Sequence, residues 1–180
     1  RAARMKPTAA VTAQFPEADM ARAQGYAEKL AELVRCETVS CRDQADRRKF
    51  SAFHKLLRRT FPRLHRAAEI MEFDGSLLYK ITGTAPGQKP PILLMSHQDV
   101  VAAEGEWPHE PFSGDIADGA VWGRGTVDTK GSLFCIMQSV EELLESGWQP
   151  ECDVYIASSC TEEWSGDGAP ATAAWLKEHG

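Results

Sequence analysis

Apolar residues recur at helical spacing in two segments near the start of the chain. The first begins after Asp19, a candidate N-cap, and predicts a helix that runs to about Cys36. The second begins at Asp46 and ends at Pro62, because proline cannot continue a helix. In the second segment, basic residues occupy the side opposite the apolar stripe: Arg48, Lys55, Arg59, Arg63 and Arg66. Because no exposed aromatic residues interleave this basic face, we interpret it as a solvated helix side and expect no nucleic-acid partner.

Short apolar runs in the rest of the chain predict strands. These runs are residues 77–82, 91–95, 120–122 and 154–157. The runs 91–95 and 154–157 contain no charged residue, which is typical of strands buried on both faces. An Asp118-Gly119 hairpin signal precedes the run 120–122, and residues 133–144 and 169–179 predict helices. The alternation of predicted strands and helices along the chain predicts an α/β fold, a three-layer α/β/α sandwich with a mostly parallel mixed sheet.

The composition indicates one globular domain. Residues 1–16 are rich in Ala, Thr and Pro and predict a flexible lead-in, so residues 17–180 should form the folded part. The apolar content of 43% and the charged content of 26% are typical of a globular protein. Because no apolar run approaches the ~18 residues that a membrane span needs, we expect no membrane partner.

The five cysteines bear on the compartment. They include no C-x-x-C pair and no zinc-finger spacing, which favours a reducing compartment and a cytoplasmic protein. The chain does not begin with Met, so the sequence leaves open whether processing has removed an upstream segment. Export, with a Cys36–Cys41 disulfide, is therefore an alternative.

Charge is distributed unevenly along the chain. Residues 1–70 carry 15 Lys and Arg against 8 Asp and Glu, whereas residues 71–180 carry 5 against 18. Bound cations would offset such an acidic segment, although an acidic solvated surface explains it equally well.

Residues with metal-binding chemistry follow the predicted strands. His97 and Asp99 come directly after the run 91–95; an imidazole there can ligate a metal through one nitrogen and donate the other N–H to a carboxylate. Asp128 lies in a turn between glycines, from which a carboxylate can present one oxygen to each of two cations.

The third cluster is a pair of neighbouring carboxylates. Glu162 and Glu163 follow the run 154–157, and one of them can bind metal while the other acts as a general base. Since α/β sheets bind ligands at the carboxyl ends of their strands, we expect the three clusters to form one site.

Each cluster alone also has a simpler interpretation. His97 can make an ordinary hydrogen bond at a strand end, with Asp99 in a turn. Asp128 can be the N-cap of the following helix. Glu162 and Glu163 can form an exposed acidic loop. The clusters are far more specific together, in this order, than any one of them alone.

A long ordered set of motifs covers the last two thirds of the chain. It comprises residues 94–101, 107–108, 111–114, 118–125, 128–131 and 162–163. In these motifs the chain, from about Phe50 onward, resembles the M20 family of zinc peptidases and deacylases. Within that family it is most similar to the branch of carboxypeptidase S and the N-acyl amino acid hydrolases. The resemblance implies a zinc-exopeptidase-like sandwich.

The resemblance also implies a role for each candidate residue. His97 would ligate one zinc, Glu163 the other, and Asp128 both, while Asp99 would orient His97. Glu162 would be the general base, which takes a proton from the bridging water and passes it to the leaving amine. Two zinc ions, for which Co or Mn can substitute, would be the cofactors. A cis peptide bond is expected directly after Asp128.

Parts of the family pattern have no counterpart in the chain. The family uses a further carboxylate after the Glu-Glu pair and a His near its far C-terminus, and His179 follows Glu163 too closely to replace either. We expect His179 on the surface and residues 17–180 to be the N-terminal part of a catalytic domain, truncated at the C-terminus and without the inserted dimerisation domain. Each zinc would have two protein ligands here, whereas catalytic zinc generally has three. We therefore predict weak zinc binding and no activity for this chain alone.

The intact protein is expected to hydrolyse an amide bond next to a free carboxylate. Its substrate would be a small peptide or an N-acyl amino acid, as for a carboxypeptidase, dipeptidase or deacylase, and it could form a homodimer. An alternative is a noncatalytic binding or assembly module on the same fold, against which the joint presence of His97, Asp128 and Glu163 argues. A serine hydrolase is a poor candidate because the chain has no G-x-S-x-G motif.

Overall fold

The computed structural model describes residues 17–43 and 46–179, which form helices, strands and connecting loops. The helices are α1 (Glu17–Arg35), α2 (Arg48–Thr60), α3 (Pro62–Ala67), α4 (Gly131–Glu145) and α5 (Gly168–His179). The strands are β1 (Glu69–Phe73), β2 (Ser76–Ile81), β3 (Ile92–His97), β4 (Asp115–Ala117), β5 (Ala120–Trp122) and β6 (Val154–Ser159). The lead-in predicted for residues 1–16 lies outside the described residues.

Helix boundaries agree with the sequence signals at some ends only. The predicted N-cap role of Asp19 is wrong, because α1 already begins at Glu17. Before α2, the carboxylate of Asp46 accepts the backbone N–H of Arg48 over 2.9 Å, so the acidic residue does stabilise this helix start. As predicted, α2 ends before Pro62, which then opens α3 at a position where its missing N–H costs no hydrogen bond.

The main sheet has the strand order β1-β2-β6-β3 and is mixed, as predicted. Only β3 and β6 pair in parallel, whereas β1–β2 and β2–β6 are antiparallel. The expectation of mostly parallel pairing is therefore wrong for the described residues. The two-residue turn Asp74-Gly75 joins β1 to β2, and a connection that short permits only an antiparallel pair.

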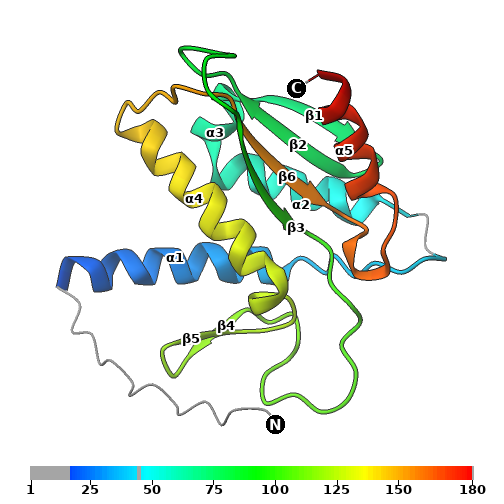
Figure 1. Cartoon of the computed structure of the whole chain (residues 1–180). Helices are drawn as coiled ribbons and strands as arrows, with labels where there is room; N and C mark the ends of the chain where they lie inside the picture. Colours follow the sequence, from blue (N-terminus) through cyan, green and yellow to red (C-terminus); the bar gives the residue numbers. More distant parts are fainter. Residues whose placement is uncertain (1–16, 44–45, 180) are drawn as a thin grey trace, which may run out of the picture.

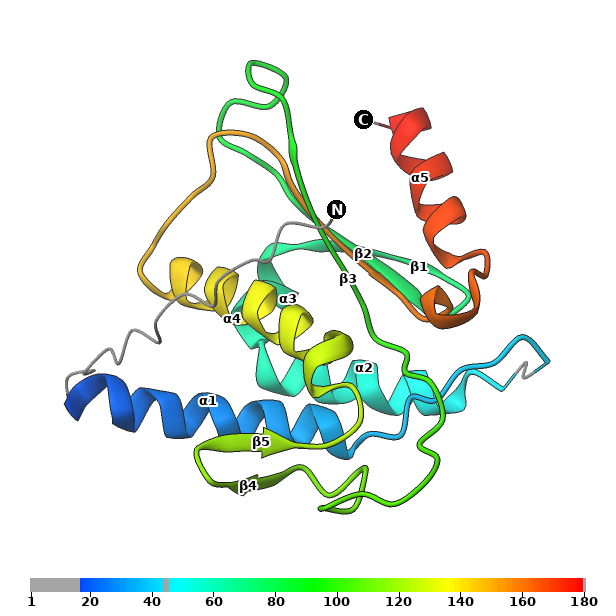
Figure 2. The same cartoon turned by 60° about the horizontal axis from the view of Figure 1, so that its bottom comes forward.

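A two-stranded hairpin of β4 and β5 lies beside α1, away from the main sheet (Figure 2). Its turn residues, Asp118 and Gly119, have φ values of 53° and 75°. Two successive positive φ values suit the type of turn that the Asp-Gly signal predicts, so this prediction is confirmed.

Helices cover both faces of the main sheet (Figure 1). Of the described helices, α5 covers one face, where Trp175 and Leu176 pack against Leu78, Tyr155 and Ala157. The other helices cover the opposite face and enclose the main core. Its largest fully buried side chains include Phe53, Leu57, Phe61, Leu64, Leu133 and Met137. The predicted three-layer arrangement is thus confirmed.

The apolar run of β3 predicts a strand that is buried on both faces, and this prediction is wrong. Ile92, Leu93 and Met95 are 48%, 43% and 63% exposed. The reason is position in the sheet: β3 is an edge strand of the described sheet, and apolar grooves separate it from α4 on one face and α5 on the other. β6 has a similar apolar run but lies between two strands, and it is buried throughout, as predicted.

Two further features bear on the compartment predictions. Among the described residues, no helix combines the length and apolarity that crossing a membrane requires. All five cysteines are free, so the structure contains no disulfide between Cys36 and Cys41, the alternative that the sequence left open.

Candidate metal centre

The three predicted clusters meet at one edge of the sheet. Since β3 and β6 run in parallel, with His97 opposite Ser159, their carboxyl ends lie side by side. The turn that contains Asp128 approaches this edge from the amino end of α4. The ligand atoms of His97, Asp128 and Glu163 lie within 4.8 Å of one another.

His97 is the central side chain of this group and is 8% exposed. Its Nδ1 lies 3.0 Å from the backbone oxygen of Asp99 and 3.4 Å from the Asp99 carboxylate. Both are acceptors, so Nδ1 carries a proton and Nε2 faces the carboxylates of Asp128 and Glu162, at 3.0 and 3.4 Å. An imidazole held in this way has its second nitrogen directed at the site, as a metal ligand requires.

Charge around His97 changes its protonation. Burial disfavours the charged ring, but hydrogen bonds to Asp99 and the negative charges of Asp99 and Glu162 outweigh burial and raise the pKa of His97 to about 9. Near neutral pH the ring is therefore an imidazolium that donates from Nε2 to Asp128. A cation that binds there must replace this proton.

Asp99 connects more of the site than the sequence predicts. Its side chain is fully buried, and its carboxylate accepts hydrogen bonds from the Ser40 hydroxyl (2.5 Å) and from the backbone N–H groups of Glu162 (3.2 Å) and Glu163 (3.1 Å). Burial opposes ionisation, yet the hydrogen bonds with His97, Ser40 and Glu163 lower the pKa of Asp99. The anion therefore holds the imidazole and the Glu162-Glu163 turn in a fixed relation.

Ser40 is a residue that sequence reasoning missed. It is 59 positions from Asp99 and belongs to the segment after α1, which pairs with Val100 through a single bridge at Val39. No local motif marks it, because its role arises only when this segment meets the end of β3.

Asp128 lies in the irregular turn Thr126–Lys130, which leads into α4. Its side chain is 76% exposed and caps no helix, so the N-cap interpretation is not supported. The Asp128–Thr129 peptide bond is cis, as the resemblance implies. The turn begins after Gly125, where φ is +86° and an added Cβ would lie only 2.5 Å from Cγ1 of Val100, so the backbone can pass here only with glycine.

Glu162 and Glu163 start a short 3-10 turn after β6. The Glu162 side chain is 55% exposed, and Glu163 is half-buried. Burial raises the pKa of Glu163 against the opposing charge of His97, and the negative charges of Asp128, Asp99 and Glu162 raise it further. Four carboxylates thus share a small region with one imidazole, an arrangement that a cation would stabilise.

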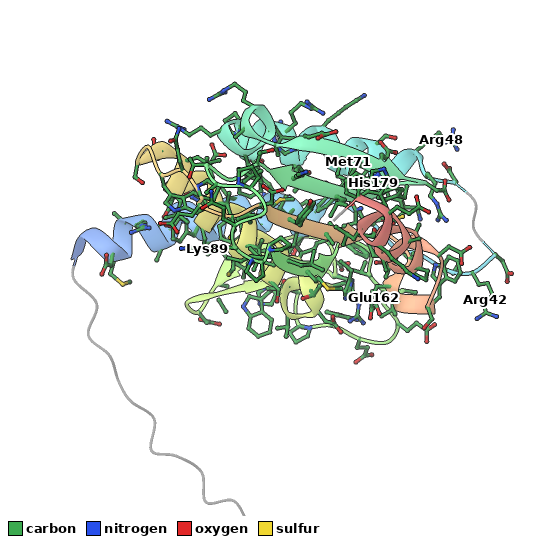
Figure 3. The ribbon with its side chains drawn as sticks, turned by 45° about the horizontal axis from the view of Figure 1, so that its top comes forward. Arg42, Arg48, Met71, Lys89, Glu162 and His179 are labelled. Atoms are coloured by element: carbon green, nitrogen blue, oxygen red, sulfur yellow. The ribbon has the colours of Figure 1, made fainter. Side chains whose placement is uncertain are left out.

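His179 does not belong to this group. It is exposed, its ring stacks on Trp175, and its Nδ1 lies 2.9 Å from the Trp175 backbone oxygen. Figure 3 shows the labelled side chains of His179 and Glu162 well apart. Its predicted place on the surface is confirmed.

The donor atoms fit a divalent transition metal. One imidazole nitrogen and several carboxylate oxygens are a ligand set that zinc, cobalt and manganese accept. Two ligands of one zinc ion, each at about 2.1 Å, can be at most about 4.2 Å apart. Nε2 of His97 and Oδ1 of Asp128 are 3.0 Å apart, within this limit, and the ligand atoms of all three residues lie within 4.8 Å of one another.

Comparison with known proteins places these residues in a family. The model of Peptidase family M20/M25/M40 matches residues 93–180. The probable carboxypeptidase S-like 2 of Dictyostelium discoideum is 39% identical over 148 residues, which are 78% of this chain and 28% of that protein. Carboxypeptidase S of Saccharomyces cerevisiae is 36% identical over 166 residues, or 84% of this chain and 29% of that protein.

A second kind of relative is the human N-fatty-acyl-amino acid synthase/hydrolase PM20D1. It is 34% identical over 159 residues, which are 85% of this chain and 31% of that protein. The chain thus spans less than a third of the length of these curated relatives.

Solved structures support the fold. Human carnosine dipeptidase 1 superposes with a TM-score of 0.71 at 17% identity, over 89% of this chain and 36% of that one. The dipeptidase Dug1p from Saccharomyces cerevisiae superposes with a TM-score of 0.62 at 22% identity, over 83% of this chain and 34% of that one. The family model and the sequence identity of 34–39% with the curated relatives show that the chain belongs to peptidase family M20.

Proposed function

We propose that this chain is the N-terminal part of the catalytic domain of a metal-dependent hydrolase. The longer protein would cleave an amide bond next to a free carboxylate, in a small peptide or an N-acyl amino acid. The observation that carries the proposal is the cluster of His97, Asp128 and Glu163, whose ligand atoms lie within 4.8 Å of one another beside the carboxylate of Glu162. The names of the relatives, which include carboxypeptidases and N-fatty-acyl-amino acid hydrolases, support this substrate class.

Two zinc ions are the proposed cofactors. His97 and Asp128 would hold one ion, and Asp128 and Glu163 the other, with cobalt or manganese as substitutes. The high exposure of Asp128 supports a shared role, since a carboxylate that faces Nε2 of His97 through Oδ1 and is 76% exposed can present its other oxygen to a second ion. When bound, zinc would polarise the amide carbonyl and make water more acidic.

Glu162 is the proposed general base. Its carboxylate is close to the proposed ligands, at 3.4 Å from Nε2 of His97, and its side chain is exposed to solvent and substrate. Its backbone N–H is held by Asp99, which fixes the start of the side chain. Glu162 would accept a proton from the attacking water and donate it to the leaving amine.

The chain alone is proposed to be inactive. It offers two ligands for each ion, whereas catalytic zinc sites generally have three protein ligands and water. The longer protein would supply the rest and would also cover the exposed edge strand β3. The length of the relatives, more than three times the matched region, supports this division.

The test uses the full-length protein and a matched pair of substrates. A dipeptide or N-acyl amino acid with a free carboxylate is compared with the same compound as its C-terminal amide. We expect hydrolysis of the free acid, loss of activity after chelation, and recovery with zinc. Glu162→Gln should lower the rate by about a hundredfold or more while zinc affinity changes little. Hydrolysis by the chelated protein, or a wild-type rate in E162Q, would contradict the proposal.

A further inference from the structure

We infer that Lys130 is a positioning residue for the metal centre: its buried ammonium fixes the turn that carries Asp128 to the end of α1. This inference rests on the proposed function, in which Asp128 is a metal ligand. Lys130 does not reach the site itself, and it acts through the turn Thr126–Lys130.

The burial of Lys130 is unusual. The residue is 0% exposed, although lysine is among the residues that proteins rarely bury completely. Its Nζ donates hydrogen bonds to the backbone oxygens of Leu33, at 3.0 Å, and Cys36. It also lies 5.3 Å from the centre of the Phe53 ring. An ammonium group is expensive to bury, so these contacts need a reason beyond filling space.

The two acceptors belong to the carboxyl end of α1. The last carbonyl groups of a helix have no partner within it and form the negative end of the helix dipole. An ammonium is the natural partner for such a group of oxygens. Lys130 therefore attaches the turn to the last turn of α1, at Leu33, and to Cys36 directly after it, 97 and 94 positions earlier in the sequence.

The other hydrogen bonds of the turn mostly join it to itself or to residues a few positions away. The backbone N–H of Lys130 donates to the oxygen of Gly125 at 2.8 Å, which closes the turn on itself. The Ser96 hydroxyl donates to the oxygen of Thr129 at 3.3 Å, a long contact. The side chain of Asp128 is mostly exposed and contacts His97. The place of the Asp128 carboxylate therefore depends on the backbone of its turn, and Lys130 is the buried anchor of that backbone.

The same segment of chain also reaches the other half of the site. A few residues beyond Cys36, Ser40 donates to the carboxylate of Asp99. The segment from Leu33 to Ser40 thus holds Asp128 through Lys130 and His97 through Asp99. This explains why an ammonium is placed here: it sets one proposed ligand relative to the other.

The experiment compares Lys130→Met with wild type in the full-length protein. Methionine fills similar space without a donor. A matched control, Leu64→Ala, truncates a fully buried side chain of α3 in the main core and leaves every residue of the turn unchanged. We expect K130M to bind zinc at least tenfold more weakly and to change the absorption spectrum of the cobalt-loaded protein. L64A should keep both the affinity and the spectrum, although its unfolding temperature falls.

A second readout is independent of metal. Hydrogen exchange of the metal-free protein should be faster in K130M at the backbone N–H groups of Lys130 and Gly131, and unchanged there in L64A. If wild type binds no zinc, the proposed function fails, and the exchange data still decide whether Lys130 holds the turn. Should K130M not fold, Lys130→Gln, which keeps N–H donors but no charge, takes its place with the same expected changes. Unchanged exchange, or wild-type zinc affinity and cobalt spectrum, would overturn the inference.

Discussion

Replacement of Asp99 by Asn should destabilise the protein strongly, although the two side chains have the same shape. The Asp99 carboxylate is fully buried and accepts three hydrogen bonds, two at Oδ2 from Ser40 and Glu163 and one at Oδ1 from Glu162. An amide has only one oxygen. If that oxygen keeps the bonds of Ser40 and Glu163, the NH₂ group faces the N–H of Glu162 and the Nδ1–H of His97.

The magnitude follows from these contacts. Hydrogen bonds to a charged group contribute about 1.5–3 kcal/mol, and a buried donor left without a partner costs about 1–3 kcal/mol. Loss of the charge and of one acceptor should therefore lower the free energy of unfolding by about 3 kcal/mol. Ser40→Ala removes one of the same bonds and should cost about 1–2 kcal/mol.

The assay is urea unfolding of the metal-free chain, followed by circular dichroism. The double variant Ser40→Ala/Asp99→Asn completes a double-mutant cycle. The two losses of stability should be less than additive, because both changes act on the hydrogen bond between Ser40 and residue 99. A D99N chain with wild-type stability, or a double variant with strictly additive losses, would refute the view that Asp99 connects the segments of the site.

Three other predictions follow from single features. Because the pKa of His97 is raised to about 9, a zinc ion that binds Nε2 of His97, as we propose, must displace a proton at neutral pH. Zinc affinity measured by calorimetry should therefore rise about tenfold per pH unit up to pH 9, with about one proton released; a flat profile contradicts this. Glu141 is buried and accepts hydrogen bonds from the backbone N–H groups of Arg63 and Leu64 at the start of α3. Glu141→Ala should therefore lower the free energy of unfolding, measured in urea, by about 2 kcal/mol. The control Glu145→Ala, at an exposed position, should lower it by less than about 0.5 kcal/mol. Met95→Lys places a charge on the exposed edge strand β3 and should reduce self-association of the chain, measured by sedimentation velocity. Met20→Lys, at a similarly exposed position on α1, should leave self-association unchanged. Equal effects of the two changes would refute the view that the edge strand drives self-association.

Periodic patterns predicted much of the fold. The helix over Gly131–Glu145 and the strand Val154–Ser159 have strong, regular patterns, and their local preferences agree with their environment. β1 (Glu69–Phe73) was missed, because its mixed sequence becomes a strand only by pairing with β2. The burial of β3 was predicted wrongly, since an apolar run describes a strand and not its neighbours.

The site was predictable to the extent that strand ends define it. His97 and Glu163 each follow an apolar run, and parallel pairing of those runs brings their ends together. The anchors were not predictable. Ser40 and Lys130 act on residues far away in the sequence, through contacts that exist only after α1, β3 and α4 have packed. Local motifs thus indicate which residues are candidates for the site but not which residues hold them in place.

The most direct test of the proposed metal centre is a zinc titration of residues 1–180, with Asp128→Asn as the matched control. Both proteins have the same size and nearly the same shape, so a difference reports on the Asp128 carboxylate. The account predicts weak zinc binding by the wild-type chain, well below that of a four-ligand site, and a further loss of about tenfold or more in D128N. Identical titration curves for the two proteins would contradict the proposal that Asp128 is a metal ligand.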